Sequence, residues 1–182
     1  MSYHDGELID ETWYVHKIED AKIGHRWTRT FNVQIAKRKL IRTLTIDELR
    51  IPRFGRTVSQ SIRSATLETA EGKILQLAYE TKSGATKRTY SATVAGDTLH
   101  WESQNAKRRH GTVAWKDSIG GYQSLERQLR QSPLADGESR KITVMMPLFD
   151  EPVTYRLSKP ANATNDLPTI SVYSGSQSTA SS

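Results

Sequence analysis

Short segments in which apolar and polar residues alternate follow one another from Thr12 to about Val113, and this repetition constrains the fold more than any other feature. The clearest segment is Lys73–Thr81, where every second residue from Leu75 to Tyr79 is apolar. A period of two is typical of a half-buried β-strand. Because turn signals separate the segments at spacings of about 8–15 residues, the pattern predicts an antiparallel meander.

We therefore predict a mainly β fold, an antiparallel meander of about eight to ten strands over residues 9–158 that forms a strongly curved sheet or half-open barrel. Residues 121–131 repeat apolar side chains at helical spacing before Pro133, which predicts one short helix that covers an open face or end of the sheet. Gly24 interrupts a strand pattern and predicts a bulge or a close backbone approach. The expected core residues are Trp13, Val15, Trp27, Phe31, Leu44, Ile46, Leu75, Leu77, Tyr79, Leu99, Trp101, Trp115 and Leu129.

The two ends of the chain differ in composition from this body. Residues 1–8 are expected to form a flexible N-terminus. Residues 159–182 contain few apolar side chains to offset the entropy cost of ordering the backbone, so we predict a disordered tail or linker. The alternative is that Thr169–Tyr173 adds a last strand.

The net charge of +6 and the pI near 9.6 raise the question of a nucleic-acid partner. A phosphate-binding surface needs a concentrated basic stripe, ideally with aromatic platforms. Here the basic residues are scattered along strands and at edges, where Lys protects a sheet from edge-to-edge aggregation. Nucleic acid is therefore the weaker alternative, and its contacts would be Lys107, Arg108 and Arg109.

Catalytic signatures are missing from the sequence. It contains no cysteine, which excludes disulfides, thiolate metal sites and thiol nucleophiles. Nucleophile-elbow, phosphate-loop and dinucleotide motifs are absent, and the five histidines lack the spacing of metal ligands. We predict a protein that is not an enzyme, with no catalytic residue, no metal and no cofactor.

No apolar run approaches the roughly 18 residues of a membrane span, and residues 1–10 lack the apolar centre of a signal peptide. The chain as written is expected to be soluble. A bacterial periplasmic or envelope location is expected if a leader was removed, and the cytoplasm otherwise.

The four tryptophans all fall in strand patterns. Core packing is the favoured interpretation, because a buried aromatic side chain removes about 150–250 Å² from water. The alternative is a binding module that holds a lipid or saccharide on a concave, tryptophan-bearing face of the sheet. Its ligand-binding residues would be Trp13, Trp27, Trp101 and Trp115.

Three stretches carry a family resemblance. Trp13–Gly24 has the order of a short strand, a polar turn and Lys-x-Gly, and Ser64–Gly72 is a further similar stretch. Pro133–Glu138 has the order Pro-Leu, short gap and Gly-Glu ahead of the strand pattern Lys141–Met146. Over residues 9–158 the chain resembles the region that precedes the catalytic domain in bacterial transglutaminase-like proteins, and similar meanders occur in envelope domains of unknown function.

The resemblance implies an accessory or interaction domain whose partner would be a catalytic domain of the parent protein or another envelope protein. Transglutaminase-like catalysis uses a Cys nucleophile activated by His and oriented by Asp. Because the sequence has no cysteine, no catalytic residue of that family can be assigned to it.

Overall fold

The computed structural model describes residues 6–53, 55–116, 118–121, 124–146, 151–161 and 169–173. The chain divides into two compact units, Met1–Trp115 and Lys116–Ser182.

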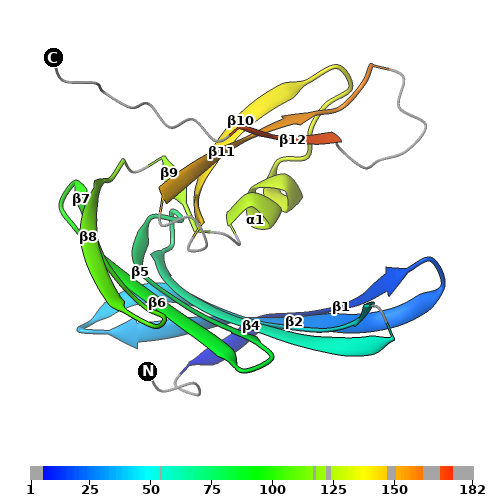
Figure 1. The fold of residues 1–182 in the computed structure, drawn as a ribbon. Coiled ribbons are helices and arrows are strands. Elements are labelled where there is room, and N and C mark those ends of the chain that lie inside the picture. The colour runs from blue at the N-terminus through cyan, green and yellow to red at the C-terminus, as the bar shows by residue number, and fades with distance from the viewer. Residues whose placement is uncertain are drawn as a thin grey trace, which may run out of the picture. The chain divides into compact units, whose positions relative to one another are not determined.

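The first unit is an eight-stranded antiparallel sheet in which each strand pairs with the next along the chain (Figure 1). This confirms the predicted meander. The sheet curves strongly but does not close into a barrel, so β1 and β8 are its two edges. The strands are β1 (Glu7–Ile18), β2 (Ala21–Ile35), β3 (Arg38–Arg53), β4 (Arg56–Thr69), β5 (Ile74–Ser83), β6 (Thr86–Ala95), β7 (Thr98–Gln104) and β8 (Arg108–Ala114).

The second unit is a four-stranded sheet with one helix, α1 (Ser124–Gln131). The middle strands β10 and β11 pair antiparallel, β12 adds antiparallel to β11, and the short β9 adds parallel to β10. The helix lies within the predicted range 121–131, of which 122 and 123 are outside the described residues. Its Leu125 and Leu129 pack against a core of Leu134, Ile142, Val144 and Leu157. The strands are β9 (Ile119–Gly120), β10 (Ser139–Met146), β11 (Glu151–Ser158) and β12 (Thr169–Tyr173).

The predicted disordered tail differs from the structure in its described parts. The backbone N–H of Lys159 donates to the carbonyl oxygen of Glu138 at 3.0 Å, and the Lys159 carbonyl accepts from Gly137 at 2.9 Å. Thr169–Tyr173 forms β12, the alternative held open above, because its backbone pairs with β11. Residues 162–168 and 174–182 of the expected tail, and 1–5 of the expected flexible N-terminus, lie outside the described residues.

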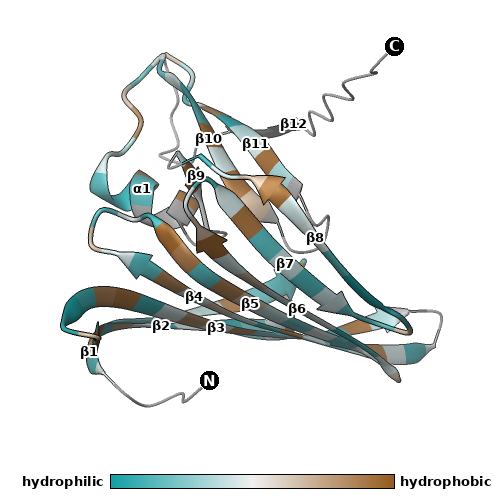
Figure 2. Ribbon diagram, turned by 90° about the vertical axis from the view of Figure 1, so that its left-hand side faces the viewer, coloured by the Kyte–Doolittle hydropathy of each residue, from teal (hydrophilic) through white to brown (hydrophobic). Residues whose placement is uncertain are grey.

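The core prediction was correct for the central strands and wrong at the edge. Phe31, Leu77, Tyr79, Leu99 and Trp115 are buried, and most of the other expected core residues are half-buried. Figure 2 shows hydrophobic and hydrophilic residues alternating along the strands.

Two expected core residues of β1 are instead exposed. Trp13 is 58% exposed and Val15 54%. The reason is topological, because β1 is the last strand of its sheet and has a neighbour on one side only.

The two faces of the first sheet differ in character. Directly opposite residues of paired strands point to the same face, and successive residues of a strand point to opposite faces. The register therefore assigns each side chain to a face. One face, here named the arginine face, carries Arg29, Arg42 and Arg63, and the other, the threonine face, carries Thr28, Thr43, Thr45 and Thr66.

Gly24 is required where the second and third strands approach each other. A Cβ atom at Gly24 would overlap the backbone carbonyl oxygen of Glu48. The adjoining β1–β2 register also shifts between His16 and Lys17. The close backbone approach predicted from the sequence is confirmed.

Candidate ligand-binding site

A pocket of about 420 Å³ lies on the first sheet, and its lining residues come from the five consecutive strands β2 to β6. Residues that lie directly opposite each other on successive strands form a row across the sheet. Most of the lining residues belong to two adjacent rows of the arginine face. Since the row between these two, on the threonine face, contributes only Thr45, Ser64, Tyr79 and Tyr90, we place the opening on the arginine face. The two rows are Arg29, Leu44, Ala65 and Ala78, and Trp27, Ile46, Arg63, Glu80 and Thr89.

The pocket exists because two small residues meet in the middle of the sheet. Ala65 of β4 lies directly opposite Ala78 of β5, and both are flanked by longer side chains. Leu44 and Ile46 of β3 provide apolar surface beside them. Two facing methyl groups leave a depression that a pair of larger side chains would fill. Because methyl groups form the floor of this depression, the floor is apolar.

Arg29 is held in place on one side of the pocket by a stack of rings. Its guanidinium carbon lies 4.8 Å from the ring centroid of Trp27 and 5.4 Å from that of Phe31. Trp13 stacks on Trp27, with centroids 5.1 Å apart, and on His25 at 5.5 Å. Cation–π contacts of this kind restrict a guanidinium that would otherwise sample many rotamers.

Glu11 of β1 fixes the outer side of the same stack. Its Oε1 accepts a hydrogen bond from Trp27 Nε1 at 2.8 Å and lies 3.5 Å from Arg29 Nε. The second contact is an ion pair without hydrogen-bond geometry. Arg29 Nε is therefore a buried donor with no hydrogen-bond acceptor among the described residues.

The opposite side of the pocket has an acidic group between basic ones. Glu80 forms ion pairs with Lys87 at 2.8 Å and Lys82 at 3.3 Å. The hydrogen bond from Lys87 is the main cause that lowers the pKa of Glu80, and Lys82 lowers it further against the opposing effect of desolvation. Arg63 lies directly opposite Glu80, and its exposed side chain makes no hydrogen bond or ion pair to another described residue.

The structure brings together two of the four tryptophans that the sequence suggested for ligand binding. Trp13 and Trp27 are opposite each other, and Trp27 lines the pocket. The Trp27 ring already has two neighbours, since Trp13 stacks on it and the guanidinium of Arg29 lies 4.8 Å from its centroid.

The other two tryptophans lie away from this pocket. Trp101 projects from the threonine face, where it stacks on Tyr90 at 6.0 Å and lies against Gly111. A Cβ atom at Gly111 would be 2.8 Å from the indole ring. Trp115 is only 4% exposed, as expected for a core position.

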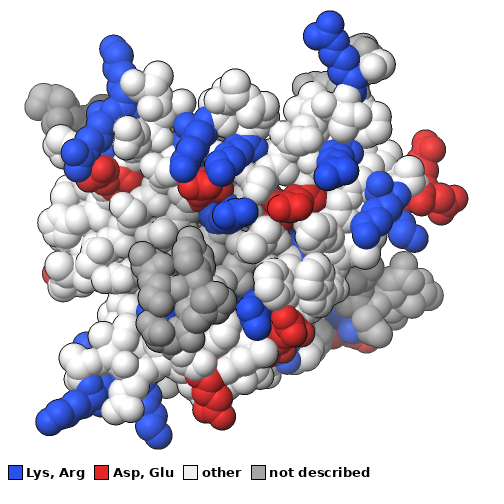
Figure 3. Space-filling view, turned by 90° about the horizontal axis from the view of Figure 1, so that it is seen from below, with Lys and Arg blue, Asp and Glu red and all other residues white. Residues whose placement is uncertain are grey.

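The basic residues suggested for nucleic acid lie at the opposite edge of the sheet. Lys107, Arg108 and Arg109 are exposed in and beside β8. Arg108 is paired with Glu102 at 2.7 Å, which raises the pKa of Arg108 and lowers that of Glu102. On the side of the molecule drawn in Figure 3, Lys and Arg are interspersed with Asp and Glu rather than gathered in one stripe.

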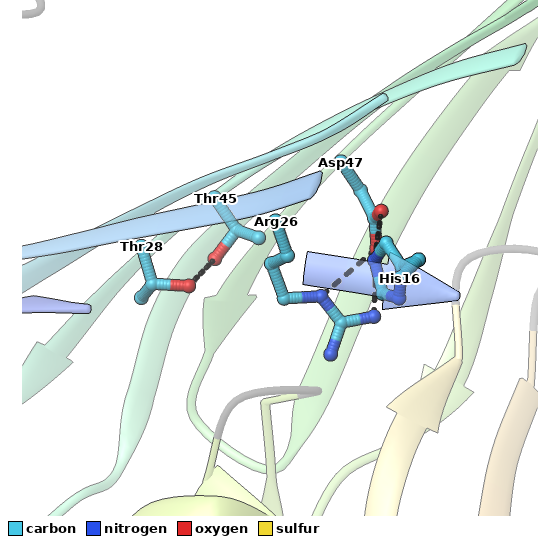
Figure 4. A network of polar contacts seen from close by, with 5 residues as sticks. All are labelled: His16, Arg26, Thr28, Thr45 and Asp47. Carbon is cyan, nitrogen blue, oxygen red and sulfur yellow. Dashed lines mark hydrogen bonds and ion pairs between the residues drawn. The ribbon is translucent and has the colours of Figure 1, made fainter. Parts of the chain in front are cut away.

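A separate polar network lies on the threonine face (Figure 4). The buried Asp47 accepts bonds from Arg26 Nε and Nη2 at 2.9 and 2.7 Å and contacts His16 Nε2 at 2.8 Å. Beside it the hydroxyl groups of Thr28 and Thr45 are 3.2 Å apart. The carboxylate is fully engaged by its two basic neighbours, which indicates a structural role.

In the described part of the chain no group of three or more His, Asp or Glu side chains could hold a metal ion. The helix that the structure describes is too short and polar to cross a membrane.

No family model, no curated protein and no solved structure matches this chain.

The residues of the pocket other than Trp27 were not identified from the sequence. In the sequence Arg29 interrupts the alternating apolar residues Trp27, Phe31 and Val33, and Ala65 and Ala78 carry no motif. The one available signal was the charged residue on the apolar face of β2, because a charge among apolar residues often has a specific polar contact or function. The alanine pair becomes visible only once the β4–β5 register is known.

Proposed function

We propose that the first unit is a non-catalytic binding domain whose pocket takes a small amphiphile with a carboxylate group. The observation that carries this proposal is one pocket that combines an apolar floor, Ala65 and Ala78, with two guanidinium groups, Arg29 and Arg63. Ligand sites are typically apolar cavities with a few polar groups that fix orientation. An amphiphile of this kind would place its acyl chain on the apolar floor and its carboxylate near the two guanidinium groups.

Arg29 is suited to bind an anion because it is preorganised. Its guanidinium lies against Trp27 and Phe31, so little side-chain entropy remains to be lost on binding. The pairing with Glu11 is loose, at 3.5 Å without hydrogen-bond geometry. A ligand carboxylate would therefore meet a guanidinium that is positioned but only partly neutralised.

Arg63 supplies a second donor from the other side. Guanidinium groups bind carboxylates through two parallel hydrogen bonds, which makes such pairs stronger than neutral hydrogen bonds. Since Arg63 has no partner among the described residues, ligand binding would not have to break an existing bond. Its exposure means that its contribution is smaller than that of a buried pair.

The same geometry favours an acyl carboxylate over a saccharide. A sugar ring is usually held by stacking on a free aromatic face, and Trp27 in this pocket already stacks on Trp13 and contacts the guanidinium of Arg29. Most of the remaining wall is aliphatic, from Leu44 and Ile46. In this proposal Trp27 holds the guanidinium of Arg29 in place and does not itself stack on the ligand.

Binding of octanoate, octan-1-ol and glucuronate to the full chain would test the proposal, with titration calorimetry and tryptophan fluorescence as readouts. Octanoate should bind at least about tenfold more tightly than octan-1-ol, since a charge-assisted hydrogen bond contributes about 1.5–3 kcal/mol. Glucuronate should bind more weakly than octanoate. Equal affinity for acid and alcohol, preference for glucuronate, or no binding at all would each overturn the proposal.

Two variants locate the binding in this pocket. Arg63→Gln should weaken octanoate binding about two- to fivefold, as expected for an exposed ion pair, and leave octan-1-ol binding unchanged. Ala65→Leu should fill the floor and weaken both ligands. Arg50→Gln, the same change at an exposed position of the arginine face outside the pocket, is the matched control. Circular dichroism of each variant verifies its fold.

The wider role implied by the family resemblance, an accessory domain beside a catalytic domain, stays a prediction. A binding domain without its own chemistry is compatible with that role. Turnover of a peptide, ester or glycoside by the pure protein would contradict the non-catalytic part of the proposal.

A further inference from the structure

The two edges of the first sheet differ in length and in the number of exposed apolar side chains. Edge strand β8 has 7 residues and carries Arg108, Arg109 and His110, all exposed. Charges of this kind prevent another strand from pairing with an edge. Edge strand β1 has 12 residues and pairs only with β2 in the described part of the chain. Its exposed hydrophobic residues are Leu8, Ile9, Trp13, Tyr14, Val15 and Ile18.

A long edge strand with several exposed apolar side chains is open to pairing with another strand. Its outward backbone N–H and C=O groups are a template for one more strand, and its exposed side chains would gain from burial. The register shifts of β1 fall between Leu8 and Asp10 and between His16 and Lys17. The regular stretch between them is therefore Asp10–His16, and its middle residue is Trp13.

This stretch is complementary to a reversed copy of itself. It begins with the acidic residues Asp10 and Glu11 and ends with His16, followed by Lys17. When a copy is laid antiparallel with Trp13 opposite Trp13, Asp10 falls opposite His16 and Glu11 opposite Val15. Aromatic pairs across an antiparallel ladder are favourable, and like charges are not brought together within this stretch.

We propose that β1 is a dimerisation edge, at which two copies of this chain pair β1 with β1 about a two-fold axis that passes midway between the two Trp13 residues. The axis is perpendicular to the sheet, because only then do directly opposite residues of the two copies lie on the same face. The two eight-stranded sheets become one continuous sheet. Trp13 of each copy covers the other, in line with its exposure of 58% despite its stacking on Trp27.

Sedimentation equilibrium of the full chain across a concentration series tests the association. The wild-type chain should form dimers, and Val15→Glu should raise the dissociation constant at least about tenfold, because it places a carboxylate opposite Glu11 of the other copy. Thr112→Glu, which adds the same charge to the other edge strand β8, should leave the dissociation constant unchanged. A wild-type chain that stays monomeric, or equal effects of the two variants, would overturn the proposal.

The absence of cysteine allows the register to be tested with clean disulfide probes. In the proposed pairing, residue 12 of one copy lies opposite residue 14 of the other, within the Cα–Cα range of about 4.4–6.8 Å that a disulfide needs. Residues 12 and 12 of the two copies are about 8 Å apart. Oxidising a mixture of the Thr12→Cys and Tyr14→Cys variants should give the mixed disulfide dimer in preference to either homodimer.

A mixture that gives no preference for the mixed product would contradict this register. The test is independent of the pocket, because neither Thr12 nor Tyr14 lines it. The variant Arg63→Gln should weaken octanoate binding and keep the dimer. Failure of one proposal is thereby distinguished from failure of the other.

Discussion

The guanidinium carbon of Arg29 lies 4.8 Å from the ring centroid of Trp27, so one cation is held on an aromatic face beside an apolar pocket. Glu11 touches both partners, through a hydrogen bond from Trp27 and an ion pair with Arg29. The arrangement explains why a strand with an otherwise apolar face contains an arginine. The ring stack fixes the position of a cation in the wall of the pocket.

Replacing Glu11 by Gln tests this arrangement. Gln retains an oxygen that can accept the Trp27 hydrogen bond, but it removes the charge beside Arg29. We expect octanoate affinity to rise about two- to fivefold, because an exposed ion pair contributes only about 0.2–1 kcal/mol and its loss leaves Arg29 less neutralised. Calorimetry measures the change, with Glu48→Gln as the control outside the pocket. A loss of affinity would show that Glu11 acts mainly by ordering Arg29.

Asp47 should be among the most sensitive polar positions of the sheet. Asp47→Ala leaves Arg26 and His16 without their shared acceptor on the threonine face. Because those two side chains keep 26% and 29% exposure, we expect a loss of about 2–3 kcal/mol rather than the full cost of an isolated buried charge. Urea denaturation measures it. Glu48→Ala, at the neighbouring exposed position, should change stability by less than about 0.5 kcal/mol.

The tryptophans should differ in cost according to their burial. Trp115→Ala removes a side chain that is 4% exposed and should destabilise the protein by about 3–5 kcal/mol. Trp13→Ala should cost about 1 kcal/mol in the monomer, since it loses stacking and little burial. Dilute conditions are needed for the second variant, so that dissociation of a dimer does not contribute. Equal costs would contradict the edge position of β1.

Acid should weaken a turn of the second unit through Glu138. The backbone N–H of Ala135 donates to its carboxylate, and Arg140 donates as well, and in that order these bonds lower the pKa of Glu138 below its ordinary value of 4.5. A lowered carboxylate pKa stabilises the fold above about pH 4.5, and this contribution disappears as the pH falls through the folded-state pKa. Thermal unfolding between pH 3 and 7 should show a smaller pH dependence for Glu138→Gln. An identical pH profile would contradict the prediction.

Sequence periodicity was sufficient for the strands of the central sheet. In β5, Leu77 and Tyr79 lie at alternate positions of the strand and are buried as predicted. Gly24 likewise marked a close approach that the structure confirms. Both are local signals, because a strand's alternation and a missing Cβ are properties of the chain at that point.

Contacts between distant parts of the chain could not be obtained in this way. Asp47 meets His16 across 31 positions of sequence, and Ala65 meets Ala78 only through the β4–β5 register. Nothing in the alternation of β4 or β5 says which residues will be opposite each other. The pocket was therefore invisible in the sequence although each of its strands was predicted.

The sequence by itself determined the class of fold, an antiparallel meander, because alternation with a period of two makes half-buried strands and short polar turns join them to their neighbours. The tertiary structure alone decided which strands became edges and which side chains met across the sheet. Trp13 and Trp27 have equally apolar rings, but Trp13 lies on a strand with one neighbour and Trp27 on a strand with two. Burial depends on what lies on both sides of a strand, and that is set by pairing between segments rather than by the segment's own residues.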